Sequence, residues 1–198
     1  IARLREFVEN SQNQEVYSEC SKRFPDLNGL ANELNDAFIR LKNEIPGFKV
    51  PEIYTYVSGF DFQYPIKYTD SDLVIALDMY LGSDYAGYRK MGIPLYISER
   101  LTPGHILPDC MKEISMPYIS GTKTPVLLDA MIEEGKILYF AGLMLPETED
   151  YLIAGYSTAQ TEWCKANESK LWEFLIENEL LYSSNAESMS MFMTDGPF

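Results

Sequence analysis

The chain has 198 residues, of which 46% are hydrophobic and 23% are charged. These proportions argue against a disordered chain and against a collagen-like or coiled-coil rod. The 30 acidic residues outnumber the 16 basic ones, which gives a formal net charge of −14. Because nucleic acids bind to basic surfaces, this charge argues against a nucleic-acid partner. A chain of this length is expected to fold as one domain with a full hydrophobic core.

Few side chains are suited to metal binding or nucleophilic catalysis. The single histidine, His105, excludes a zinc helix with two histidine ligands and disfavours a haem or copper site. No Gly-x-Ser-x-Gly elbow is present to supply a serine nucleophile. Cys20, Cys110 and Cys164 are widely spaced and odd in number, which argues against a disulfide framework. We therefore expect small buried thiols and no cofactor.

The N-terminal segment, about residues 1–48, is predicted to be helical. Its clearest helix ends before Pro46-Gly47 and carries an apolar stripe at helical spacing, formed by Leu30, Leu34, Ala37, Phe38, Leu41 and Ile45. Because one face of this helix is apolar, we expect it to pack on a sheet.

Three strands are predicted within residues 49–82. Residues 53–60 and 64–68 are rich in β-branched and aromatic side chains, and residues 73–80 are nearly all apolar. Short polar turns separate the three runs, which favours hairpins over helical crossovers. We expect a small, mainly antiparallel sheet.

The remaining part, about residues 83–198, is predicted to be a helical half. Thr102-Pro103 and Thr124-Pro125 each place a capping hydroxyl before a proline at the first helical position. Ser157-Thr-Ala-Gln160 forms a capping box for a further helix. Helices, then a sheet, then helices predict the α+β class, in a single domain spanning residues 1–198.

Both ends of the chain favour a fragment of a longer protein. The chain begins with Ile1 rather than Met and ends at Phe198 without a helix cap. We expect a trimmed N-terminus and a truncated C-terminus. Neither a signal peptide nor a run of 18 apolar residues is present.

Acidic residues are candidates for acid–base chemistry, because two carboxyl groups in different environments can divide the two roles. Asp78 interrupts an apolar predicted strand, where an unpaired carboxylate would be costly, so we expect a partner such as Arg100 or a cap. Asp78, Arg100 and Glu133 are possible cleft residues. A structural ion pair at Asp78 is favoured over a site.

Four tyrosines, Tyr54, Tyr56, Tyr64 and Tyr68, could form a ladder on one face of the predicted sheet. Such aromatic surfaces bind glycans or peptides. Cross-strand packing gives the same pattern and is the favoured explanation.

Several motifs follow one another between residue 54 and the end of the chain: Leu77–Tyr85, Glu99–Pro103, Leu107–Asp109, Leu127–Lys136 with Leu138–Phe140, and Trp163–Ser183. Their order resembles the gliding-motility-associated lipoprotein GldB family of Bacteroidetes. The resemblance implies a cell-envelope lipoprotein, lipid-anchored ahead of this chain and exposed to the periplasm. A role in gliding does not follow from it.

The same region is similar to predicted zinc-dependent peptidases of the gluzincin type, which carry His-Glu-x-x-His on one helix and a Glu-Gly step on the next. Here Lys112 and Met116 stand at the two histidine positions, Glu113 stands at the general base, and Glu134 stands at the third ligand. A protonated lysine has no lone pair to donate, and a thioether binds Zn²⁺ poorly. The similarity implies a zincin-like scaffold whose metal site is degenerate.

In such a scaffold the two helices face each other. The Lys112 ammonium would then lie beside the Glu134 carboxylate and replace the charge of the metal. Met116 would fill the volume of the second imidazole, and Pro117 is expected to end or kink the helix there.

Two functions are compatible with these observations. The first is a non-catalytic cell-envelope lipoprotein domain that binds a protein or glycan partner through its former substrate cleft. The alternative is a carboxylate-dependent hydrolase acting on a cell-wall or other glycan, with two carboxyl groups about 5 to 10 Å apart. We favour a chain that is not an enzyme and that is attached to the membrane only through an N-terminal lipid anchor outside this sequence.

Overall fold

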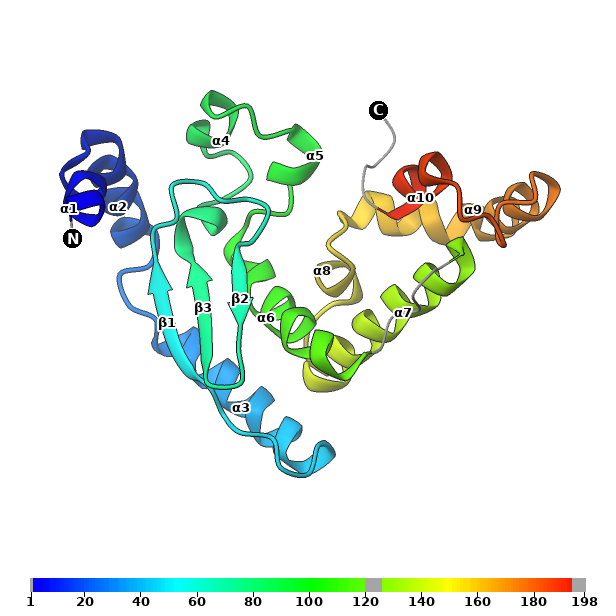
Figure 1. Cartoon of the computed structure of the whole chain (residues 1–198), viewed down its shortest axis with the longest axis horizontal. Helices are drawn as coiled ribbons and strands as arrows, with labels where there is room; N and C mark the ends of the chain where they lie inside the picture. Colours follow the sequence, from blue (N-terminus) through cyan, green and yellow to red (C-terminus); the bar gives the residue numbers. More distant parts are fainter. Residues whose placement is uncertain (1, 120–125, 194–198) are drawn as a thin grey trace. The chain divides into compact units, whose positions relative to one another are not determined.

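The computed structural model describes residues 2–119 and 126–193 (Figure 1). The chain divides into two compact units: the first unit is Ile1–Glu113, and the second unit is Ile114–Phe198. The predicted α+β class is confirmed, because a three-stranded sheet and helices make up the first unit and helices follow in the second.

The first unit contains the sheet. Its elements in chain order are α1 (Ala2–Glu9), α2 (Ser11–Arg23), α3 (Asn28–Glu44), β1 (Glu52–Tyr56), β2 (Ile66–Tyr68), β3 (Asp72–Ala76), the 3₁₀ helix η1 (Leu77–Tyr80), α4 (Ala86–Lys90), α5 (Leu95–Ser98), the 3₁₀ helix η2 (Pro103–His105) and α6 (Ile106–Ser115), whose last two residues belong to the second unit.

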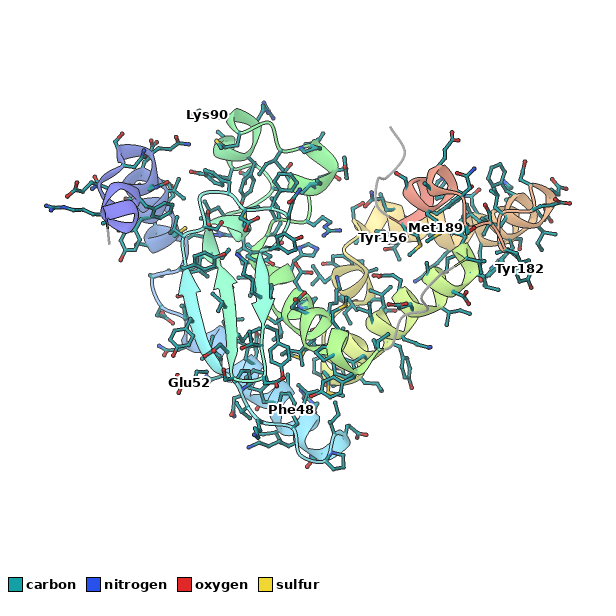
Figure 2. The ribbon with its side chains drawn as sticks, viewed as in Figure 1. Phe48, Glu52, Lys90, Tyr156, Tyr182 and Met189 are labelled. Atoms are coloured by element: carbon teal, nitrogen blue, oxygen red, sulfur yellow. The ribbon has the colours of Figure 1, made fainter. Side chains whose placement is uncertain are left out.

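The described elements of the second unit are helical. They are the 3₁₀ helix η3 (Met116–Tyr118), α7 (Leu127–Met144), α8 (Asp150–Ala154), α9 (Thr158–Glu177) and α10 (Ala186–Met193). Tyr182, which follows α9, is 78% exposed (Figure 2).

The helix predicted before Pro46-Gly47 is confirmed as α3. Its apolar stripe is buried at Leu34, Ala37, Phe38 and Leu41. Gly47 adopts a φ of +87°, which a residue with a Cβ rarely adopts, and so reverses the chain. The centroid of the Phe48 ring then lies 6.1 Å from that of the Phe38 ring.

The sheet is mixed, so the prediction of an antiparallel meander is wrong for β1. The strand order is β1-β3-β2, with β1 parallel and β2 antiparallel to the central strand β3 (Figure 1). A tight turn joins β2 and β3, in which the Thr69 N–H donates to the Asp72 carbonyl oxygen at 2.9 Å. That hairpin was predicted correctly, whereas β1 pairs with β3 and not with β2.

Asp78 explains part of this pairing. The register places Tyr56 of β1 beside Ala76 of β3, and Ser58 and Asp78 each follow two residues later. Parallel strands end at the same edge of a sheet, so the segments after β1 and β3 meet there. The N–H groups of Ser58 and Phe60 both donate to the Asp78 carboxylate at 2.8 Å.

The predicted strands are longer than the observed ones. Residues 57–60 leave β1 through Gly59 and Phe60, whose φ angles are +76° and +67°. The run 73–80 forms a strand only as far as Ala76, because the next four residues form η1. Asp78 therefore lies in a 3₁₀ helix and not in a strand.

The predicted tyrosine ladder is wrong. Lateral neighbours in a sheet point to the same face, and successive residues alternate. Tyr54 and Tyr56 share the face of Lys67, whereas Tyr68 pairs with Leu73 on the opposite face. Tyr64 precedes β2 and is 62% exposed.

The helix signals of the second half have mixed outcomes. Pro103 begins η2, which leads directly into α6, but the predicted cap by the Thr102 hydroxyl is wrong, because that hydroxyl lies 2.8 Å from His105 Nδ1 instead. Helix α6 ends at Ser115, as the proline at position 117 predicts. The capping box is confirmed, because the Gln160 N–H donates to the Ser157 hydroxyl at 3.2 Å and the Gln160 side chain accepts from the Ser157 N–H at 2.8 Å. Thr124-Pro125 lies outside the described residues.

The first turn of α7 is capped in another way. The Leu127 and Leu128 N–H groups each donate at 2.9 Å, to the carbonyl oxygens of Ser183 and Leu181 respectively. These backbone bonds satisfy N–H groups that no intrahelical partner can reach. The segment after α9 therefore holds the start of α7.

Among the described helices, none is both long enough and apolar enough to span a lipid bilayer.

Candidate functional site

The four zincin-like positions fall in both units. Lys112 and Glu113 lie in α6 within the first unit, whereas Met116, in η3, and Glu134, in α7, belong to the second. Met116 is 50% exposed and Glu134 is exposed. Lys112 and Glu134 belong to different units, and their predicted pairing remains a prediction.

Lys112 forms an ion pair within its own helix. Its ammonium nitrogen lies 3.3 Å from Asp109 Oδ1, and the two side chains are 19% and 20% exposed. The Tyr80 hydroxyl donates to Asp109 Oδ2 at 3.0 Å. Tyr80 is fully buried, and burial raises the pKa of its hydroxyl well above the ordinary value. Asp109 thus holds α6 to η1 and neutralises the lysine.

His105 is buried beside this group. Its Nδ1 lies 2.8 Å from the Thr102 hydroxyl, and its Nε2 has no hydrogen-bond partner among the described residues. Burial lowers the pKa of the imidazole, although the Asp109 charge acts in the opposite direction. The neutral ring is therefore favoured, which fits a structural residue at the start of a helix.

Asp78 is fully buried and has its partners at the end of β1 and not at Arg100. In addition to the two N–H groups of Ser58 and Phe60, the Ser58 hydroxyl lies 3.0 Å from the carboxylate. Arg100 is exposed. Asp78 forms neither the predicted ion pair nor a helix cap; its carboxylate binds the loop that follows β1 instead. A carboxylate used in this way fixes a loop and has little capacity left for acid–base chemistry.

The remaining predicted carboxylates, Glu113 and Glu133, belong to different units. Glu113 is half-buried in α6, and burial raises the pKa of its carboxyl group. Glu133 is half-buried in α7 of the second unit. A raised pKa is the property of a general acid, so Glu113 keeps one feature that the hydrolase hypothesis requires.

The cysteines are free thiols. Cys20 and Cys110 are buried, as predicted, whereas Cys164 is only half-buried. Burial raises the pKa of Cys20 to about 12 and that of Cys110 well above its ordinary value. Such thiols remain protonated at neutral pH, which disfavours a nucleophilic role.

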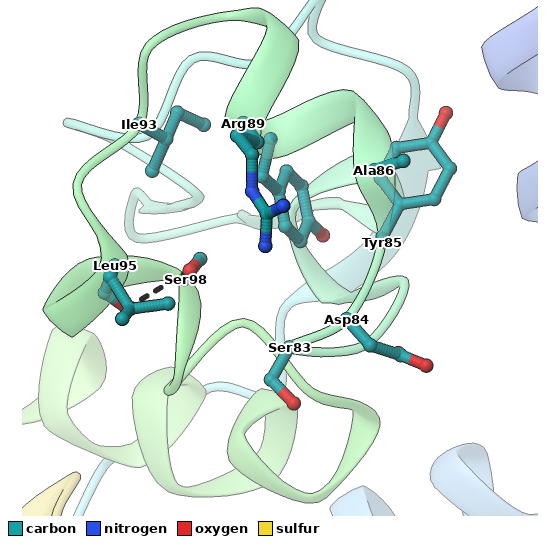
Figure 3. Close-up of a pocket in the computed structure, with 9 residues that line it drawn as sticks. Ser83, Asp84, Tyr85, Ala86, Arg89, Ile93, Leu95 and Ser98 are labelled. Atoms are coloured by element: carbon teal, nitrogen blue, oxygen red, sulfur yellow. Dashed lines mark hydrogen bonds between the residues drawn. The ribbon is translucent and has the colours of Figure 1, made fainter.

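The first unit also has a cavity that the sequence did not reveal. It has a volume of about 180 Å³ and is bounded by Ser83, Arg89, Ile93, Leu95 and Ser98 (Figure 3). Asp84 and Tyr85 also line it, and both belong to the Leu77–Tyr85 motif. Arg89 carried no sequence signal, because an exposed arginine in a short helix is usually a solvated side chain.

A second cavity of about 170 Å³ lies between α2 and α4. Glu15 and Glu19 line it on α2, and Lys90 lines it on α4. Glu19 already pairs with Lys22 at 2.6 Å, and acidic and basic groups are mixed there. This cavity therefore has no single charge preference.

A zinc site does not fit the residues at the zincin-like positions. The Lys112 ammonium is bound to Asp109 and has no lone pair to offer a metal. Within residues 2–119 and 126–193, no group of three or more His, Cys, Asp or Glu side chains is arranged to hold a metal ion.

The chain belongs to the gliding motility protein GldB family, whose family model matches residues 1–198. The family match therefore covers the whole chain, whereas the motifs of the sequence covered only the part from residue 54 to the end. No curated protein and no solved structure matches the chain. Membership in this lipoprotein family indicates a cell-envelope lipoprotein. None of these matches supports the similarity to zinc peptidases.

Proposed function

We propose that this chain is a non-catalytic domain of a cell-envelope lipoprotein, exposed to the periplasm, which binds a protein or glycan partner on a degenerate metallopeptidase-like scaffold. The observation that carries the proposal is the Lys112–Asp109 ion pair, 3.3 Å long and about four-fifths buried on both sides. A lysine in this state stabilises α6 and cannot act as a metal ligand. Family membership supports the envelope location.

For the hydrolase alternative, Asp78 is a poor candidate for a catalytic carboxylate. Asp78 is fully buried and accepts three hydrogen bonds from Ser58 and Phe60. Glu113 retains a raised pKa, so it is the residue to substitute in an activity test. We expect the wild-type chain and the Glu113→Gln variant to release equally little soluble product from dye-labelled peptidoglycan. Release by the wild type that Glu113→Gln abolishes would support the hydrolase.

Restoring the missing ligands tests the metallopeptidase-like scaffold. In a zincin arrangement, the double variant Lys112→His with Met116→His would bring two imidazoles together with Glu134. We expect this variant to bind one zinc ion in a calorimetric titration, and we expect the wild type to bind none. Adding Glu134→Gln to the double variant is the matched control and should weaken zinc binding.

The possible results separate the two parts of the proposal. A double variant that folds but does not bind zinc would contradict the zincin-like scaffold and leave the non-catalytic role in place. Stoichiometric zinc in the wild type would contradict the non-catalytic role itself. Far-UV circular dichroism of each variant shows whether it is folded.

A further inference from the structure

The cavity beside Arg89 combines a cation with polar and apolar walls. Arg89 is exposed and takes part in none of the ion pairs formed among the described residues. Figure 3 shows its guanidinium group extending into the space between Ser83 and Leu95, whereas the Asp84 carboxylate points away from it. In a chain with a net charge of −14, this local positive group is available to a ligand.

The hydroxyl groups of the cavity differ in what they can offer. The Ser98 hydroxyl donates its proton to the Leu95 carbonyl oxygen at 2.9 Å, so its oxygen is left as an acceptor. Ser83 is exposed, and its hydroxyl takes part in none of the hydrogen bonds formed among the described residues, so it can donate. The cavity therefore presents a cation at Arg89, a hydroxyl donor at Ser83 and an acceptor at Ser98.

The apolar side of the cavity is formed by Ile93 and Leu95. Its volume of about 180 Å³ is far larger than the ~10–15 Å³ that a single water molecule requires. A small aliphatic group would therefore fit beside the charged group. Among the described residues that line this cavity, Arg89 is the one arginine or lysine, so a singly charged anion matches it better than a phosphate does.

We propose that this cavity binds the C-terminal carboxylate of a peptide chain, with Arg89 and Ser83 donating to the carboxylate and Ser98 accepting the N–H of the last peptide unit. Guanidinium groups bind carboxylates through two parallel hydrogen bonds, which a peptide end can accept. Ile93 and Leu95 would contact a terminal aliphatic side chain. This inference rests on the proposed partner-binding function and gives that partner a chemical class: a protein with a free aliphatic C-terminus.

The test is a titration of the ¹⁵N-labelled chain with N-acetyl-alanyl-valine, followed by NMR. We expect chemical-shift changes at the backbone amides of residues 83–98 and at the Arg89 side chain. The same peptide with a C-terminal amide is the matched ligand and should cause no such changes, because it lacks the carboxylate. Equal binding of the two peptides would overturn the proposal.

Variants of the chain locate the effect. Arg89→Gln should weaken binding of the free acid at least about tenfold, since charged hydrogen bonds are lost. Arg89→Lys keeps the charge but loses the paired geometry, and its affinity should lie between those of Arg89→Gln and the wild type. Asp84→Asn removes a nearby negative charge and should strengthen binding.

Arg23→Gln is the control for net charge. Arg23 is exposed at the end of α2 and does not line the cavity, so its substitution should leave the affinity unchanged within about twofold. An affinity that Arg89→Gln does not change, or that Arg23→Gln changes equally, would overturn the site. The amide spectrum of each variant outside residues 83–98 shows whether it is folded.

Two further probes test the ligand class. Inorganic phosphate that binds more tightly than the peptide would replace the carboxylate assignment. N-acetyl-D-alanyl-D-alanine that binds more tightly than the L-peptide would assign the cavity to cell-wall stem peptides and would overturn the protein partner. Failure of all the titrations removes this site without affecting the zinc and hydrolysis tests, which judge the proposed function separately.

Discussion

Substitution of Asp78 by alanine tests how the sheet is held together. The Asp78 carboxylate is fully buried and accepts from the backbone N–H groups of Ser58 and Phe60 at 2.8 Å and from the Ser58 hydroxyl at 3.0 Å. Phe60 is held at a φ of +67°, which an aromatic residue adopts only under constraint. In Asp78→Ala, the two N–H groups lose their acceptor, and the segment that follows β1 loses its attachment to η1.

The magnitude follows from the two stranded donors. A buried N–H group without a partner costs about 1–3 kcal/mol, so two of them cost about 2–6 kcal/mol. The Ser58 donor is only partly buried and can be reached by water, and Phe60 can relax from its left-handed conformation. We therefore expect the free energy of unfolding to fall by about 3 kcal/mol, in the lower half of that range.

Urea denaturation followed by far-UV circular dichroism measures this change. The rate of hydrogen exchange at residues 57–62, measured by mass spectrometry, should rise as the stability falls and so locate the loss of structure in the segment after β1. Asp70→Ala removes an exposed carboxylate from the turn between β2 and β3 and should change stability by less than about 0.5 kcal/mol. If Asp78→Ala costs less than about 1 kcal/mol and leaves exchange unchanged, the role assigned to Asp78 is wrong.

Three further predictions concern single side chains. Glu179 is exposed at a φ of +55° after the end of α9, so Glu179→Gly should stabilise the chain by about 0.5–1 kcal/mol in thermal or urea denaturation. Glu173→Gly within α9 should destabilise it by about 1 kcal/mol, and stability changes of the same sign in the two variants would contradict the assignment. His105, the single histidine, should titrate by ¹H NMR with a pKa below 6.5, and a pKa above 6.5 would contradict the burial of a neutral ring. Because the fold favours the neutral ring, the free energy of unfolding should fall as the pH decreases from 6.5 through the folded pKa. A double-mutant cycle with Lys112→Met and Asp109→Asn should give a coupling of about 0.5–1 kcal/mol in urea denaturation, and zero coupling would show that the ion pair does not contribute to stability.

Signals within a short stretch of sequence predicted the helices well. The apolar stripe before Pro46-Gly47 defines α3, and the capping box at Ser157 defines the start of α9. Pro117 lacks a backbone N–H, so α6 ends just before it. These features depend on bonds between residues three or four positions apart, which a sequence shows directly.

The sheet depended on contacts between distant residues. A turn such as the one at Thr69 can be found from sequence, but the choice of β3 over β2 as the partner of β1 cannot. That choice is tied to Asp78, which binds a segment about 20 residues earlier in the chain. A polar residue in an apolar run indicated that Asp78 needs partners, and only the structure shows that they are backbone N–H groups.

The candidate site was predictable only in part. Asp109 and Lys112 are three residues apart on one helix, so their ion pair follows from helical geometry once α6 is recognised. The cavity at Arg89 depends instead on how α4 and α5 turn the chain; the Leu77–Tyr85 motif supplies part of its lining, but no motif includes Arg89. Its recognition required the structure.

The zinc content of the wild-type chain, purified without chelators and measured by inductively coupled plasma mass spectrometry, tests the non-catalytic assignment most directly. The Lys112–Asp109 ion pair predicts a zinc content far below one ion per chain, and it predicts no increase after incubation with zinc and removal of the excess. One tightly bound zinc ion per chain that is lost in a Glu113→Gln, Glu134→Gln double variant would contradict the assignment and would identify the chain as a metalloprotein.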